Sequence, residues 1–205
     1  MRNFAPRTDM SSLDFLNRRL SVPSRQLGAP APTPEQLDAL LAASLRAPDH
    51  GKLMPARLLL IRGETRAKLG ERLATIHRGI EPNAPEAAFE KDRERYNFAP
   101  LIVCVIARVD EQHPKVPAQE QILSAGCVAY NLLLGAQALG YGAQWLTGWA
   151  AYDREAAALL GLAESERVIG FVHIGTVQKP ANEGPRPVLA DVVSELTLEG
   201  LRAEG

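Results

Sequence analysis

The feature that most constrains the fold is an unbroken apolar run from Leu101 to Ala107. Successive side chains of a strand point to opposite faces, so an unbroken apolar run is typical of a strand that is covered on both sides. The run therefore predicts a central strand in a sheet flanked by helices. Three other segments predict further strands, namely Arg57–Arg62, Ala143–Thr147 and Val168–Gly175.

Helical spacing and capping residues predict helices between these strands. Thr33 is expected to be the N-cap of a helix, with Gln36 closing a capping box, and the helix is expected to run to about Arg46. The longest expected helix spans Ala118–Leu139, and Gly140 is expected to end it in the left-handed conformation. Because helices and strands alternate, the pattern by itself indicates an α/β-type domain.

The remaining segments carry weaker patterns. We expect one domain over residues 1–205, with residues 1–11 flexible. The charged segment 82–96 is expected to be a solvated helix or a mobile excursion. The proline-rich residues 178–205 are expected to form an arm that runs over a surface.

Charge, cysteine content and missing motifs exclude several classes of function. The 205 residues include 23 basic and 24 acidic ones, a balance that argues against nucleic-acid binding. No apolar stretch reaches the roughly 18 residues of a membrane span, and the first residues do not resemble a secretory signal. Two cysteines cannot form a disulfide framework, and neither a zinc pattern nor a P-loop is present. We therefore expect a cytoplasmic protein without a metal site.

The long expected helix is rich in small residues. Glycine costs about 1 kcal/mol relative to alanine inside a helix, so Gly126 and Gly135 need a reason to be there. A close approach to another helix would supply one. This helix could be packed on the sheet as the core of the chain, or it could form the centre of a homodimer interface.

Five segments, taken in order, resemble the FMN-dependent nitroreductase family, and most closely its short, YdjA-like branch. The resemblance covers about Leu13 to Leu196, and it rests on the order of the segments more than on any single one. The segments are Arg18–Ser21, Arg46–Gly51, Ser124–Cys127, Gly140–Gly148 and Gly170–Thr176.

This resemblance implies an α+β fold with a mostly antiparallel central sheet between helices and a C-terminal arm that wraps a partner subunit. It implies a homodimer with two FMN molecules at the interface. NADH or NADPH would reduce the flavin, and a nitroaromatic, quinone-like or other electron-poor small molecule would then take the electrons. The chemistry would centre on the flavin, with no catalytic side chain. The alternatives are a flavin-consuming or dehalogenating enzyme and a flavin carrier or redox sensor with little turnover.

The family's N-terminal motif binds the FMN phosphate, and arginine suits that task because its guanidinium contacts phosphate through two N–H groups. Arg18, Arg19 and Ser21 match this motif in two alternative registers, because Leu20 stands where a second arginine is usual. Arg186 matches a further phosphate-binding arginine of the C-terminal arm. Alternatively, the N-terminal arginines end a helix and Arg186 is a solvated loop residue.

Arg46 and His50 match a family element that reaches the FMN bound mainly by the other subunit. A cation at the pyrimidine end of the flavin would favour the negative charge of its reduced form. Alternatively, Arg46 closes a helix and His50 lies in a turn. Ala56 replaces a tryptophan that is frequent in the family, which affects the expected substrate pocket.

Trp145, Leu146 and Thr147 match a strand that contacts the flavin ring and its polar edge. A backbone N–H in this strand would lie near the flavin nitrogen that accepts electrons. The simpler alternative is a buried tryptophan in an ordinary strand.

Overall fold

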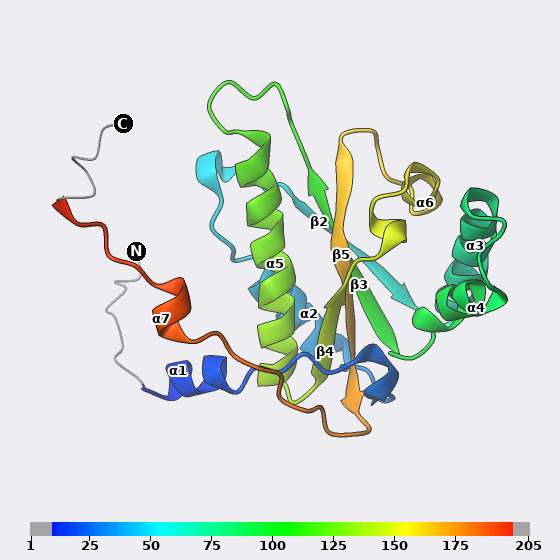
Figure 1. Ribbon diagram of the computed structural model, residues 1–205, viewed down its shortest axis with the longest axis horizontal. Coiled ribbons are helices and arrows are strands. Elements are labelled where there is room, and N and C mark those ends of the chain that lie inside the picture. Colours follow the sequence, from blue (N-terminus) through cyan, green and yellow to red (C-terminus); the bar gives the residue numbers. More distant parts are fainter. Residues whose placement is uncertain (1–9, 199–205) are drawn as a thin grey trace.

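The central sheet is antiparallel in every pairing among the described strands. A computed structural model describes residues 10–198 of the chain, so the expected flexibility of residues 1–11 falls almost wholly outside it. The order β2–β3–β5 forms the main sheet, with β4 paired to β5 (Figure 1), and the short β1 also pairs with β5. The strands are β1 (Leu27–Gly28), β2 (Ala56–Arg62), β3 (Leu101–Arg108), β4 (Gly142–Leu146) and β5 (Glu166–Val177).

This pairing makes the fold α+β, as the family resemblance implies. The α/β type that the alternation of elements indicates is wrong, because β2, β3 and β5 are antiparallel neighbours although helices separate them in sequence. An antiparallel strand covered on both faces has the same unbroken apolar pattern as a parallel one. The four expected strands themselves are confirmed.

Helices cover both faces of the sheet, with α2 and α5 on one side and α3, α4 and α6 on the other (Figure 1). The capping box of Thr33 and Gln36 is present, and Gly140 follows α5 with a φ of 85°. The helices are α1 (Met10–Asn17), α2 (Pro34–Ser44), α3 (Glu64–Ile80), α4 (Glu86–Arg95), α5 (Ala118–Ala138), α6 (Arg154–Leu159) and α7 (Leu189–Val192).

Strand β3 divides the apolar core between these two layers. Val103 and Val105 pack with α2 and α5, whereas Ile102 and Cys104 pack with α3. Residues Leu101–Ala107 are all at most 2% exposed. Burying a side chain of this size contributes about 1.5–3 kcal/mol, so this strand makes a large contribution to the core.

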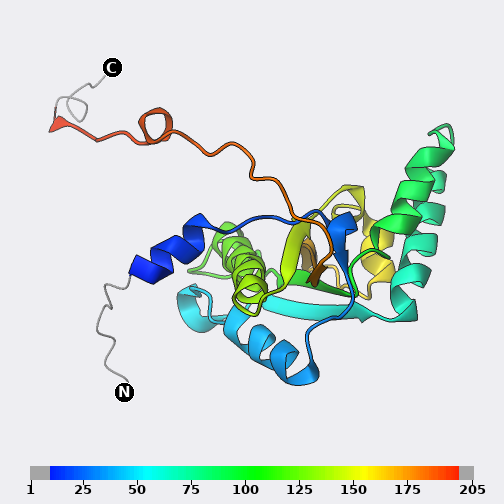
Figure 2. The ribbon, with the colours of Figure 1, turned by 90° about the horizontal axis from the view of Figure 1, so that it is seen from below.

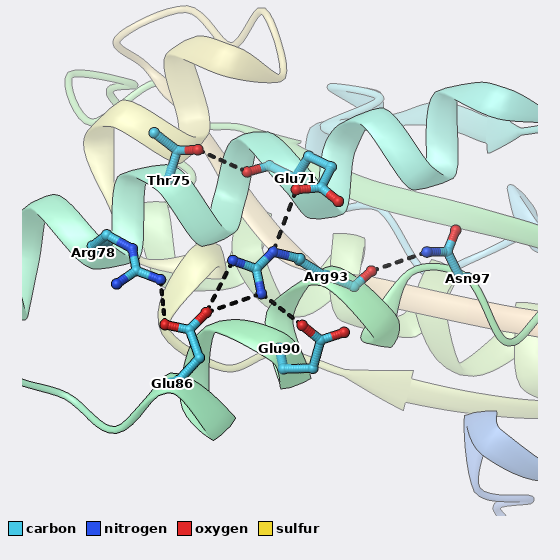
Figure 3. Close-up of polar contacts among 7 residues, drawn as sticks. All are labelled: Glu71, Thr75, Arg78, Glu86, Glu90, Arg93 and Asn97. Carbon is cyan, nitrogen blue, oxygen red and sulfur yellow. Dashed lines mark hydrogen bonds and ion pairs between the residues drawn. The ribbon is translucent and has the colours of Figure 1, made fainter.

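Helix α4 corrects the expectation for residues 82–96. The segment is a helix, but it is neither a mobile excursion nor fully solvated, because Phe89 and Tyr96 are each 1% exposed. On its outer side Arg93 forms ion pairs with Glu71 of α3 and with Glu86 and Glu90 of its own helix (Figure 3). Helix α4 is therefore packed firmly on α3.

The described N-terminal segment and the segment after β5 lie close together near β4, and both extend away from the body of the molecule. Val22 N–H donates to the carbonyl of Ala143 at 3.0 Å, which lays the N-terminal segment along β4. Beyond β5 the described residues 178–198 run out past α5 and α1 (Figure 2), and apolar side chains such as Leu189 and Leu196 are exposed there. The wrapping of a partner by this arm stays a prediction. Within residues 10–198, no helix is both long enough and apolar enough to cross a membrane.

Candidate functional site

A cavity of about 410 Å³ brings together residues from three distant parts of the sequence. Arg19 and Ser21 come from the N-terminal segment, and Trp145 and Thr147 come from the end of β4. The Arg19 guanidinium donates to the Ser21 hydroxyl at 3.2 Å, so both polar groups lie on the same side of the cavity. Four of the nine expected cofactor residues therefore share one cavity.

A second cavity, of about 210 Å³, adjoins the same two residues and adds Arg186. Arg186 Nη2 donates to the Arg19 carbonyl at 2.9 Å, and Arg186 Nε lies 3.1 Å from the carboxylate of Glu183. Two guanidinium groups and one hydroxyl thus line a small polar space. These groups suit a phosphate, because charged N–H donors bind phosphate oxygens strongly.

The edge of β4 offers backbone hydrogen-bonding groups beside this cavity. Ala143 points its carbonyl away from β5, toward Val22. In an antiparallel pair every second residue presents both backbone groups to the same side, so Trp145 also points its N–H and C=O to this edge. Its indole N–H donates to the Ile169 carbonyl at 3.1 Å, which fixes the ring over the sheet.

Four of the expected cofactor residues line neither of these two cavities, and Leu146 and Arg18 are the first two. Leu146 points to the opposite face of β4, where it lines a groove of about 700 Å³ together with Arg95 and Phe98. The Arg18 side chain is 82% exposed and pairs with Asp14 of α1 at 3.8 Å. Between the two N-terminal arginines, the structure therefore favours Arg19 as the one that faces the cavities.

Arg46 and His50 lie on a different part of the surface, in the loop after α2. The Asp49 carboxylate accepts the N–H groups of Leu53 and Met54, at 3.1 and 2.8 Å, and so fixes the loop. His50 Nδ1 lies 2.7 Å from the carboxylate of Glu120, at the start of α5. Both side chains are exposed, and neither lines the cavities of Arg19.

The structure adds residues of α5 that sequence reasoning missed. Tyr130 and Leu133 line the cavity of about 410 Å³ together with Trp145 and Thr147. They lie three positions apart in α5 and so share one helix face, and this spacing is their only signal in the sequence. Their apolar and aromatic surface suits a flat ring better than a polar ligand.

The two glycines of α5, Gly126 and Gly135, have different surroundings. A Cβ at Gly135 would overlap the Leu40 side chain, so this glycine allows α5 to approach α2 within the same chain. A Cβ at Gly126 would meet only Trp145 Cη2, at 3.9 Å. Packing inside one chain thus explains Gly135 and leaves Gly126 beside the ring of Trp145.

A buried histidine lies on the other face of the sheet, away from this site. His173 of β5 is fully buried, and neither ring nitrogen has a hydrogen-bond partner among the described residues. Burial lowers the pKa of His173 to about 3, so the ring is neutral at physiological pH. Among residues 10–198 there is no cluster of side chains that could hold a metal ion.

The described residues fit a ligand that joins a phosphate to a flat ring. Arg19 and Ser21 border both cavities, so the polar space and the aromatic wall are continuous through them. The backbone edge at Trp145 could contact polar atoms of such a ring. FMN has this combination of groups, and the site needs neither a P-loop nor a metal to hold it.

Comparisons with known proteins identify the family of the chain. The sequence profile of the nitroreductase family matches residues 16–176. The chain is 36% identical over 174 residues to YdjA of Escherichia coli K12, which is assigned as an NAD(P)H nitroreductase; the match covers 84% of this chain and 92% of that protein.

Two solved structures have the same fold. A nitroreductase-like protein from Bacillus cereus superimposes with a TM-score of 0.76 at 21% identity, covering 95% of this chain and 99% of that one. A protein from Desulfovibrio desulfuricans, crystallised in complex with FMN and described as a nitroreductase, gives a TM-score of 0.71 at 20% identity, covering 93% and 99%.

Proposed function

The chain belongs to the nitroreductase family, and on this premise we propose that it is an FMN-dependent NAD(P)H oxidoreductase. Its acceptors would be nitroaromatic, quinone-like or other electron-poor small molecules. One observation carries the proposal: Arg19 and Ser21 border both a polar cavity suited to a phosphate and an aromatic cavity suited to a ring. The FMN complex of the D. desulfuricans structure supports the choice of this cofactor.

The residues of this chain would hold and orient the cofactor. Arg19 and Arg186 would neutralise the phosphate, and the Ser21 hydroxyl would donate to it. The backbone edge of Trp145 would contact the polar side of the ring, and the Tyr130 side chain would limit access of water. Bound FMN would supply the redox chemistry, taking electrons from NADH or NADPH and passing them to the acceptor in a second step.

A second copy of the chain would complete the site. Arg46 and His50 are too far from the Arg19 cavities to line them in one chain, so they would reach the flavin of the partner. Apolar side chains exposed on α1 and α5, among them Leu16, Leu123 and Tyr130, support a homodimer interface on this side. The exposed apolar tail beyond Val188 is consistent with an arm that covers a partner.

Anaerobic reduction tests the proposed function. Purified protein loaded with FMN is expected to be yellow, to bleach when NADH or NADPH is added, and to regain its colour with a quinone or a nitroaromatic compound. Protein that binds FMN but is bleached by neither nucleotide would contradict the enzyme and favour a flavin carrier. Protein that binds no FMN would contradict both.

A further inference from the structure

A buried carboxylate on α4 has no part in the cavities described above. Asp92 is 6% exposed, yet it lies in a helix in which most residues are charged and solvated. His77 Nδ1 of α3 lies 2.5 Å from Asp92 Oδ2, and the indole N–H of Trp149 lies 3.1 Å from both carboxylate oxygens. A buried charge is costly unless its hydrogen bonds are satisfied, so these contacts fix where Trp149 lies.

Trp149 belongs to the turn that directly follows β4. It lies two positions after Thr147, which lines the larger cavity, and it begins a short 3-10 turn over Trp149–Ala151. Its ring packs against the His77 ring, with centroids 5.1 Å apart. The chain therefore passes directly from the candidate flavin site into a residue that is anchored on the opposite layer of the molecule.

The same helix contacts this turn at a second point. Gly148 has a φ of 83°, and a Cβ there would overlap the guanidinium of Arg95. Asp92 and Arg95 are three residues apart, so they lie on one face of α4. One side chain holds Trp149 and the other lies against Gly148, and together they define the path of the chain after Thr147.

Helix α4 is itself well supported, as a positioning element must be. Arg93 pairs with Glu71 of α3 at 3.4 Å, and Glu86 pairs with Arg78 of α3 at 2.5 Å (Figure 3). These ion pairs are exposed and individually weak. None of them includes a residue of the 147–151 turn, so they can be removed without changing a polar contact of that turn.

We propose that Asp92 is a positioning residue for the flavin site. By holding the indole of Trp149, it fixes the turn at 147–151 and, through it, the backbone edge of Trp145 and the side chain of Thr147. The role toward flavin rests on the proposed function. The fixing of the turn is a property of the chain itself, so it can be measured without any cofactor.

Three variants test this inference. Trp149→Phe keeps a ring but removes the N–H, Asp92→Ala removes the acceptor, and Asp92→Asn keeps one acceptor oxygen. Glu86→Gln is the matched control, because it breaks ion pairs of α4 without changing a contact of Trp149. Hydrogen exchange of peptides that cover 145–152 is measured first without FMN, followed by titration with FMN.

In Trp149→Phe and Asp92→Ala, exchange over 145–152 is expected to rise while exchange of β3 is unchanged. The dissociation constant for FMN is expected to rise by at most about tenfold, because binding must then order a turn that Asp92 holds in place in the wild type. Asp92→Asn is expected to show a smaller change in both measurements, and Glu86→Gln none over this segment.

Unchanged exchange over 145–152 in Trp149→Phe and Asp92→Ala would overturn the inference, whatever the affinity for FMN. Faster exchange with unchanged FMN affinity would overturn the role of Asp92 toward the flavin site. An equal rise in Glu86→Gln would also overturn it, because Asp92 would then only help to hold α4 on the core. Wild-type protein that binds no FMN would contradict the proposed function, whereas the exchange measurement would still decide whether Asp92 positions the turn.

Discussion

Two groups of basic side chains lie at different ends of α5, and they are built differently. Arg19 and Arg186 border a shared cavity, and the Arg186 guanidinium donates a hydrogen bond to the Arg19 carbonyl. Arg46 and His50 are exposed on a fixed loop, and neither lines the cavities that Arg19 borders. The difference is what the proposed homodimer requires: Arg19 and Arg186 would bind the phosphate in one chain, while Arg46 and His50 would reach the flavin of a second copy.

The largest expected effect concerns the first group. Arg19→Ala is expected to weaken FMN binding by roughly ten- to a hundredfold, because a hydrogen bond to a charged group contributes about 1.5–3 kcal/mol. Riboflavin, which lacks the phosphate, should lose little affinity. Fluorescence titration with both ligands measures this difference.

Arg18→Ala is the control for that variant, since Arg18 is exposed and contacts only Asp14 among the described interactions. It is expected to bind FMN as the wild type does. A selective loss in Arg18→Ala in place of Arg19→Ala would show that the alternative register of the N-terminal motif is correct.

The next largest effect concerns stability, and it distinguishes Gly135 of α5 from Gly126. Gly135→Ala is expected to lower the free energy of unfolding by about 1–3 kcal/mol, because the new Cβ overlaps Leu40. Gly126→Ala has room for its Cβ and should leave stability unchanged or slightly higher. Urea denaturation compares the two variants directly.

The bulkier Gly126→Leu sharpens the comparison, because it adds a side chain beside Trp145 and toward the proposed interface. We expect it to reduce FMN content and dimer content together, as measured by absorbance and light scattering. If both stay at the wild-type level, the surface around Gly126 belongs neither to the flavin site nor to the dimer interface.

The smallest expected effect concerns the second group. If Arg46 lies near the flavin of a partner, as we propose, Arg46→Gln removes one partly screened charge there. The reduction potential should then fall by tens of millivolts, where about 30 mV corresponds to roughly 1.4 kcal/mol. His50→Ala should change it less, because an ordinary histidine is mostly neutral at pH 7. A dye-equilibrated anaerobic titration gives both values, and an unchanged potential in Arg46→Gln would remove Arg46 from this role.

Local patterns predict the fold well wherever one segment carries its own information. The capping box of Thr33 and Gln36 and the buried strand β3 follow from residues that are neighbours in sequence. The packing of helix α4 is harder to predict, because most of its residues are charged and only Phe89 and Tyr96, seven residues apart on one face, indicate a buried side. The antiparallel pairing depends on contacts between distant strands, so the alternation of elements predicts it wrongly.

In the candidate site, too, local motifs predict some residues, whereas others depend on contacts between distant segments. The motifs propose Arg18, Arg19, Ser21 and Trp145 as candidates, but only the folded chain separates the two arginines, because Arg19 lines the cavity and Arg18 is exposed beside Asp14. Tyr130 and Asp92 carry no motif, and their roles depend on which elements pack together. The half of the site that a second copy would supply cannot be read from one chain.

Mixed dimers test most directly whether two chains build each site. Chains with Arg19→Ala and chains with Arg46→Glu are co-expressed with different tags, and the mixed dimer is purified and assayed for NAD(P)H-dependent reduction of a quinone. The test uses FMN concentrations at which each variant homodimer has lost its activity. If Arg19 of one chain and Arg46 of the other then serve the same flavin, one of the two sites in the mixed dimer is intact, and activity returns to about half of the wild-type value. Activity equal to the mean of the two variant homodimers, or the absence of any mixed dimer, would contradict the shared site.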